Sequence, residues 1–124
     1  QEQLIMKQFR DHPKEQLIYL TKFFEKYEKH VALTSRRSGS PEAKKYQQYI
    51  LLLIKLTCEQ KEQVEVEPWV SKPFCPIEPA IKICKQNKNG FGEAILLVRQ
   101  GKPYEAIARY CEILDSQNIL RLLE

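Results

Sequence analysis

Apolar residues recur at helical spacing through residues 14–33, and this pattern predicts the first long helix of the chain. Intervals of 3, 4, 3 and 4 residues place five apolar side chains on one stripe of a helix. Pro13 suits the first helical position, and Glu15 lies near the positive end of the helix dipole. The residues of the stripe are Leu17, Leu20, Phe24, Tyr27 and Val31. We therefore expect an amphipathic helix of about five turns.

A second long helix is predicted over residues 41–61. Ser40 is a favourable N-cap residue, Pro41 suits the first helical position, and Glu42 follows in the first turn. Residues 49–56 are apolar at every position except Lys55. A surface helix needs only one apolar stripe, so a stretch that is apolar on nearly all sides indicates an interior helix.

Residues 64–76 predict an extended, proline-rich connector. Four prolines within residues 68–79 remove backbone donors and restrict the residues before them, so no long helix crosses this region. Residues 64–67 alternate like a strand, but the stretch is short and no partner strand is predicted. We expect Trp69 and Phe74 to pin the connector to the helices.

Three shorter helices are predicted near residues 77–88, 91–100 and 103–114. Gly90 is expected to end the first of them in a left-handed conformation, and Gly101 to end the second in the same way. Pro103 then begins the third. Residues 90–114 are therefore two short antiparallel helices rather than one long one.

Small and large residues alternate across this predicted hairpin in the manner of an α-solenoid, where helix pairs stack on their neighbours. Small residues let the helix axes approach, and large ones fill the space beside them. Residues 77–114 resemble a clathrin heavy-chain repeat, the helical hairpin found in clathrin and in vacuolar protein sorting subunits. The matching positions are Ala94, Leu97, Gly101, Ala106 and Tyr110.

The resemblance implies an all-α solenoid of stacked antiparallel hairpins. Tetratricopeptide repeats share this residue spacing, but they keep a fixed period of 34 residues, and no second copy lies 34 residues upstream of residues 101–110. Helices of uneven length, about 20 residues and then about 10, favour the looser solenoid of the trafficking proteins.

One repeat domain over residues 1–124 is expected, with a long-helix part (1–63), the connector (64–76) and a short-hairpin part (77–124). The pattern continues to the last residues without the polar capping face of a solenoid end, so we expect a piece of a longer protein. An uncovered end of such a piece would self-associate through its apolar residues. At the C-terminal end these are Leu120, Leu122 and Leu123, and at the N-terminal end they are Leu4, Ile5 and Phe9.

Composition and charge limit the number of domains and the kinds of partner that the chain can have. The chain has 124 residues, 43% of them hydrophobic and 29% charged, which suits one domain with a modest core. Residues 1–63 hold 12 basic and 8 acidic residues, whereas residues 64–124 hold 8 of each, so the net charge of +4 belongs to the first half. Arg36 and Arg37, with Lys44 and Lys45 nearby, are too few to predict a nucleic-acid interface, and a solvated loop is the simpler interpretation.

Catalytic and metal chemistry are not indicated. Cys58, Cys75, Cys84 and Cys111 lack zinc-site spacing and close pairing, and they are expected to be free thiols in a reducing compartment. His12 and His30 are 18 residues apart, and no recognisable nucleophile or glycine-rich loop accompanies them. We expect no enzyme activity, no metal and no cofactor.

Two functions remain. The resemblance implies a scaffold segment for protein–protein interaction in a vesicle coat or membrane-tethering complex, cytoplasmic and peripheral to endosomal or vacuolar membranes, with other subunits as partners. The alternative is a peptide-binding adaptor of tetratricopeptide type. No stretch approaches the roughly 20 apolar residues that cross a bilayer, and no signal peptide is predicted at residues 1–9.

Overall fold

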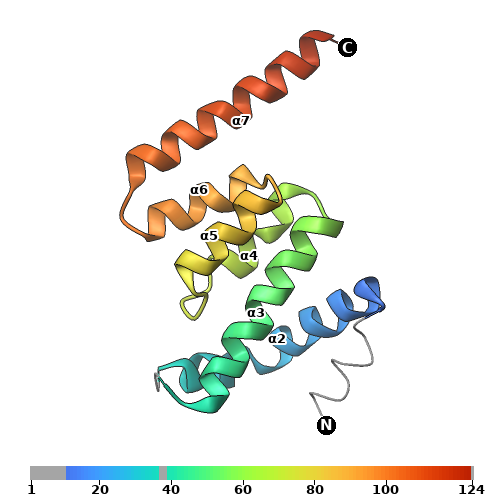
Figure 1. The fold of residues 1–124 in the computed structure, drawn as a ribbon, viewed down its shortest axis with the longest axis vertical. Coiled ribbons are helices and arrows are strands. Elements are labelled where there is room, and N and C mark those ends of the chain that lie inside the picture. The colour runs from blue at the N-terminus through green and yellow to red at the C-terminus, as the bar shows by residue number, and fades with distance from the viewer. Residues whose placement is uncertain (1–10, 37–38, 124) are drawn as a thin grey trace.

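The computed structural model describes residues 11–36 and 39–123, with side chains as far as Ile113 (Figure 1). Within these residues all regular structure is helical and no strand occurs, which confirms the predicted all-α class. The elements are α2 (Pro13–Ser35), α3 (Pro41–Gln60), the 3₁₀ helix η1 (Gln63–Val66), α4 (Glu67–Val70), α5 (Ile77–Gln86), α6 (Gly90–Arg99) and α7 (Pro103–Leu123).

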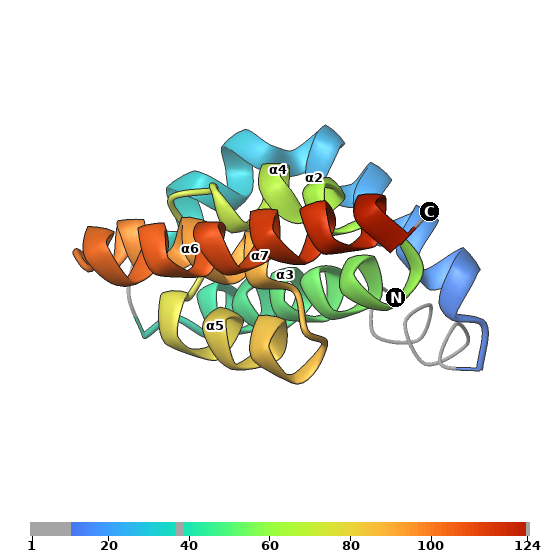
Figure 2. The same cartoon turned by 90° about the horizontal axis from the view of Figure 1, so that it is seen from above.

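The elements follow one another along the long axis of the molecule. The contacts run from α2 to α3, from α3 to α5, from α5 to α6 and from α6 to α7. In Figure 1, α2 and α3 occupy one end, α7 lies along the other, and the remaining helices lie between them. Figure 2 looks down on the second end, where α7 lies across α6.

The first helix is bent, which the sequence pattern does not show. At Tyr27 the backbone leaves the helical region, with φ of −111° and ψ of 18°. The side chain of Tyr27 is 42% exposed, whereas the other four residues of the predicted stripe are buried. The expectation for Tyr27 is wrong because a bend changes the direction in which side chains point, so one helical period does not hold across it.

The predicted interior helix is confirmed in α3. Its start is capped as expected, since the Ala43 N–H donates to the Ser40 hydroxyl at 3.1 Å. Ile50, Leu53 and Ile54 are fully buried. This burial comes from several directions, because α3 contacts α2 as well as η1, α4 and α5.

The connector is compact, and the predicted extended conformation is wrong for residues 64–70. Here η1 and α4 form short helical turns, and Pro68 lies in the first turn of α4. A proline is tolerated at that place because the N–H it lacks has no partner within the helix. Val66 and Val70 are both fully buried, and their burial fixes the turns against the core.

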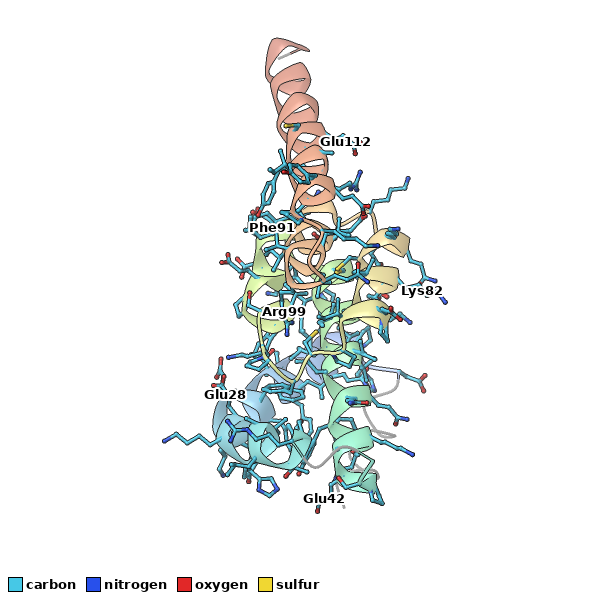
Figure 3. The ribbon with its side chains drawn as sticks, turned by 90° about the vertical axis from the view of Figure 1, so that its left-hand side faces the viewer. Glu28, Glu42, Lys82, Phe91, Arg99 and Glu112 are labelled. Carbon is cyan, nitrogen blue, oxygen red and sulfur yellow. The ribbon has the colours of Figure 1, made fainter. Side chains whose placement is uncertain are left out.

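The connector is held to the helices by aromatic and polar contacts. The rings of Trp69 and Phe74 lie 6.2 and 6.0 Å from the ring of Phe24, so the predicted pinning is confirmed. Lys72 pairs with Glu28 of α2. On the other side Arg99 of α6 donates to the carbonyl oxygen of Val70 at 2.6 Å (Figure 3, which labels Glu28 and Arg99).

The last two helices form the predicted hairpin, although α7 runs on to Leu123 instead of ending near residue 114. No glycine or proline follows Pro103, so nothing in the sequence stops this helix earlier. Gly101 has φ of +88°, the left-handed conformation that the sequence predicts. The chain reverses there, between α6 and α7.

Replacing Gly101 tests this turn. A Cβ at Gly101 would meet no atom within 4 Å, so a substitution strains only the backbone. We expect Gly101→Val to lower the free energy of unfolding by about 1–2 kcal/mol, and Gly101→Asn by less, because asparagine tolerates the left-handed conformation. Urea titrations of the two variants measure the difference. A loss below about 0.3 kcal/mol for the valine variant would contradict the expected strain.

Candidate interaction surface

The packing between α6 and α7 sets which side of α7 faces outward. Ala94 and Leu97 on α6 and Ala106 on α7 are buried. The two alanines let the helix axes come close, as small residues do at helix crossings. Three of the five positions that carry the clathrin-repeat resemblance are therefore buried, and Gly101 forms the turn between the two helices.

The fifth position, Tyr110, lies at the rim of the interface. Its ring packs edge to face on Phe91, with centroids 5.8 Å apart, and its side chain is 36% exposed. Tyr110 therefore packs beside the two helices, which is where a large residue is expected. Ile113 lies over the start of α6, next to Gly90.

The predicted role of Gly90 is also wrong. Gly90 is the first residue of α6, and the left-handed residue in this turn is Lys88, with φ of 56°. A Cβ at Gly90 would lie 3.0 Å from both Ile113 Cδ1 and Arg109 Nη2. A side chain here would have to displace the ends of the Ile113 and Arg109 side chains, so Gly90 leaves room for these residues of α7 rather than supplying a positive φ.

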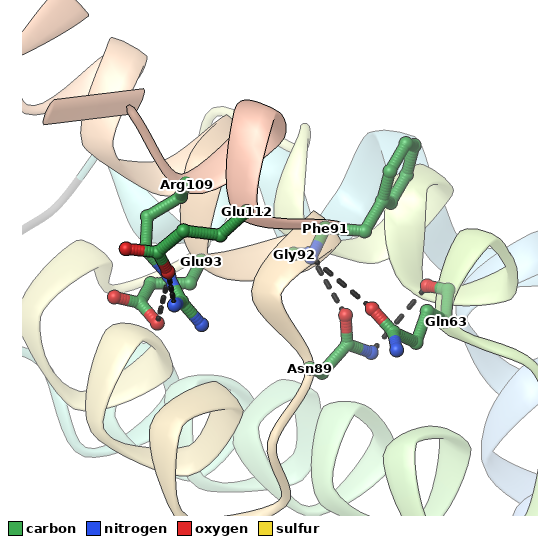
Figure 4. A network of polar contacts seen from close by, with 7 residues as sticks. All are labelled: Gln63, Asn89, Phe91, Gly92, Glu93, Arg109 and Glu112. Carbon is green, nitrogen blue, oxygen red and sulfur yellow. Dashed lines mark hydrogen bonds and ion pairs between the residues drawn. The ribbon is translucent and has the colours of Figure 1, made fainter. Parts of the chain in front are cut away.

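One ion pair crosses the same interface. Glu93 of α6 is only 5% exposed, and its Oε1 lies 3.3 Å from Nε of Arg109 on α7. The N–H is not aligned for a hydrogen bond, so the contact is purely electrostatic. Arg109 also pairs with the exposed Glu112 (Figure 4). The contact between Glu93 and Arg109 joins α6 to α7 across their interface.

The start of α6 is capped by residues that sequence reasoning missed. The Gly92 N–H donates to Asn89 Oδ1 at 2.9 Å, and the Phe91 N–H donates to Gln63 Oε1 at 3.4 Å (Figure 4). Asparagine is a preferred N-cap residue, so the order Asn89-Gly90 could have indicated a helix start instead of a helix end. The cap from Gln63 has no sequence signal, because it comes from a distant segment.

The outward side of α7 is apolar. Four residues at helical spacing point away from α6, and Tyr104 is 86% and Ile107 58% exposed. Ala108 and Cys111 are exposed beside them. We call Tyr104, Ile107, Ala108 and Cys111 the α7 outer face.

A groove borders the opposite end of the molecule. It has a volume of about 680 Å³ and lies along α2 and the end of α3. Its charged lining is mostly basic, since Lys14, Lys22 and Lys61 face a single carboxylate, that of Glu25. The apolar floor comes from Leu17 and Ile18.

Other predicted positions do not form a common site. Arg36 and Lys44 are exposed, Lys45 lies over the ring of Tyr46, and Arg37 falls outside the described residues. His12 precedes α2, and His30 packs edge to face on Tyr46. The predicted end surfaces also fall outside the residues or side chains that the structure describes. These are Leu4, Ile5 and Phe9, and Leu120, Leu122 and Leu123.

Two kinds of feature are absent from the described part of the chain. In that part, no three His, Cys, Asp or Glu residues are grouped so that they could hold a metal ion. None of the helices there combines the length and apolarity that crossing a bilayer requires. Comparison of the sequence and structure with protein-family models, curated proteins and solved structures gives no significant match.

Removing the cation from the α6–α7 ion pair tests its contribution. We expect Arg109→Ala to lower the free energy of unfolding by about 1–3 kcal/mol, because Glu93 is left buried without its partner. The matched control is Glu112→Gln, which removes the exposed partner and should cost less than about 0.5 kcal/mol. Urea unfolding measures both. Equal losses in the two variants would show that the buried pair does not hold the helices together.

Proposed function

We propose that the chain is a non-enzymatic scaffold segment that binds other protein subunits through uncovered helix faces. The observation that carries this proposal is the α7 outer face. A helix buried on one side and apolar on the other is typical of a layer that a further element covers. Tyr104 is the strongest sign that a partner covers this face, because its large aromatic ring is left almost wholly in solvent.

The order of the longer helices supports a solenoid interpretation. In a solenoid each helical layer contacts only its neighbours. Helices α2 and α3, α3 and α5, α5 and α6, and α6 and α7 contact each other in chain order, while the connector elements η1 and α4 contact both α3 and α6. Ala94, Leu97 and Ala106, which are positions of the clathrin heavy-chain resemblance, are buried. On that resemblance we propose a role in a vesicle coat or a tethering complex of endosomal or vacuolar sorting, cytoplasmic and peripheral to those membranes.

Making the α7 outer face polar tests this function. We expect the double variant Tyr104→Ser, Ile107→Ser to lose coat or tethering subunits in proximity labelling of the protein in cells. Leu33→Ser is the matched control, because Leu33 is an exposed apolar residue on α2, and we expect its partners to be unchanged. Circular dichroism of both variants checks that the helices form. Recovery of only chaperones or nuclear proteins with the unmodified chain would contradict the trafficking assignment.

A second candidate is the peptide-binding adaptor, and the groove along α2 favours it. Three lysines around an apolar floor would suit a short acidic peptide with one apolar anchor. If this is the function, Lys22→Glu with Lys61→Glu should weaken binding of an acidic peptide at least about tenfold in fluorescence polarisation. Lys26→Glu is the control, since Lys26 is exposed on α2 but does not line the groove. If the unmodified chain, the double variant and the Lys26→Glu control bind the acidic peptide equally, the peptide-binding function is contradicted and the scaffold function remains.

A further inference from the structure

A small hollow lies beside the last turns of α6. Ile95, Val98 and Arg99 line it from one side of α6, because residues three and four apart share a helix face. Tyr110 of α7 and Ser71, which follows α4, complete the lining. The volume is about 360 Å³, close to the lower end of the range for ligand pockets. The hollow therefore suits one residue of a partner rather than a long segment.

The walls of the hollow are mainly apolar, and part of their surface remains in solvent. Val98 is 55% exposed, and Tyr110 is 36% exposed. Ile95 packs against the core with one part of its side chain and is only half-buried. An apolar side chain placed against these three residues would remove their exposed surface from water, which favours binding.

Arg99 adds a positive charge to this apolar lining (Figure 3). Among the described residues it is the only charged one that lines the hollow. Its Nη1 donates to the carbonyl oxygen of Val70 at 2.6 Å, which holds the guanidinium in place and leaves its other N–H groups for a ligand. On its far side Arg99 borders a second hollow with Glu78, but it forms no ion pair with any carboxylate of the described residues.

A fixed guanidinium beside an apolar wall favours a ligand that combines a negative charge with an apolar group. A carboxylate matches the guanidinium, because two parallel N–H groups can bind its two oxygens at once. Ser71 places a hydroxyl in the same lining. Since Val98 and Arg99 are neighbours in the chain, the charge and the apolar group of the ligand must also lie close together.

We propose that this hollow binds the C-terminal residue of a partner protein, with its carboxylate on Arg99 and an apolar side chain against Val98 and Tyr110. In a C-terminal residue both groups branch from one Cα atom, and fixed donors recognise such carboxylates in other complexes. An internal acidic residue fits less well, because neighbouring side chains of an extended peptide point to opposite sides. The hollow lies outside the α7 outer face and the groove along α2, so this site does not depend on the proposed function.

Short peptides test the site on the chain of 124 residues. Acetyl-Gly-Gly-Leu with a free carboxylate should shift the amide NMR signals of Ile95, Val98 and Arg99 in a saturable manner. The same tripeptide with an amide at its C-terminus lacks the charge and should bind at least about tenfold more weakly. Acetyl-Gly-Gly-Ser keeps the carboxylate but lacks the apolar group, and it should bind at least about threefold more weakly.

Three variants locate the binding. Arg99→Gln should weaken binding of the free acid at least about tenfold, because the charge is removed. Val98→Ser should weaken it at least about threefold and should leave the fold intact, since Val98 is exposed. Lys102→Gln is the matched control, because Lys102 is an exposed cation in the turn after α6 that does not line the hollow, and binding should be unchanged. Circular dichroism checks each fold, and if Arg99→Gln fails to fold, Val98→Ser and the peptide comparison decide.

Four results would overturn the proposal. Equal binding of the acid and the amide, or equal losses in Arg99→Gln and Lys102→Gln, would show that Arg99 does not select a carboxylate. Equal binding of acetyl-Gly-Leu-Glu-Gly-amide would assign the hollow to an internal acidic residue instead of a C-terminus. Shifts caused by inorganic phosphate but not by the tripeptide would assign it to a phosphate group. The absence of saturable shifts at about 10 mM tripeptide would show that the hollow does not bind a C-terminal residue.

Discussion

The close approach of other elements to the start of α6 is the constraint on which the rest of the structure depends. A Cβ at Gly92 would lie 2.9 Å from both Val66 Cγ1 and Cys84 Sγ, so η1 and α5 can pack here only against bare backbone. Any side chain would have to displace buried neighbours. Two side chains of α7, those of Arg109 and Ile113, lie against Gly90 at the first residue of α6. The position of α6 therefore also sets the position of α7.

Asn89 is buried in this crowded region, and both ends of its amide have partners. Its oxygen accepts the Gly92 N–H, and its nitrogen lies near Cys58 Sγ and the Gln63 carbonyl oxygen. An unsatisfied amide in the same place would cost several kcal/mol. The side chain that caps α6 therefore also joins the start of this helix to the end of α3 and to η1.

The proposed function rests on one end of the molecule. The α7 outer face lies there, and its apolar side chains remain in solvent after the hairpin has formed. The interior differs, because the buried Asn89 uses both ends of its amide in hydrogen bonds.

The sequence by itself determined the long helices α2 and α3 and the turn between α6 and α7, because their signals act within one or two turns of backbone. These signals are the periodic apolar stripes, Ser40, Pro41, Gly101 and Pro103. Local signals of this range do not depend on the rest of the fold. Only the tertiary structure decided the bend at Tyr27, the packing role of Gly90 and the contact of Asn89 with Cys58. Each of these arises from segments that are distant in the chain or from the path that one helix takes over another. The same reason explains why the α7 outer face could be recognised only after Ala106 and Ile113 had been placed against α6.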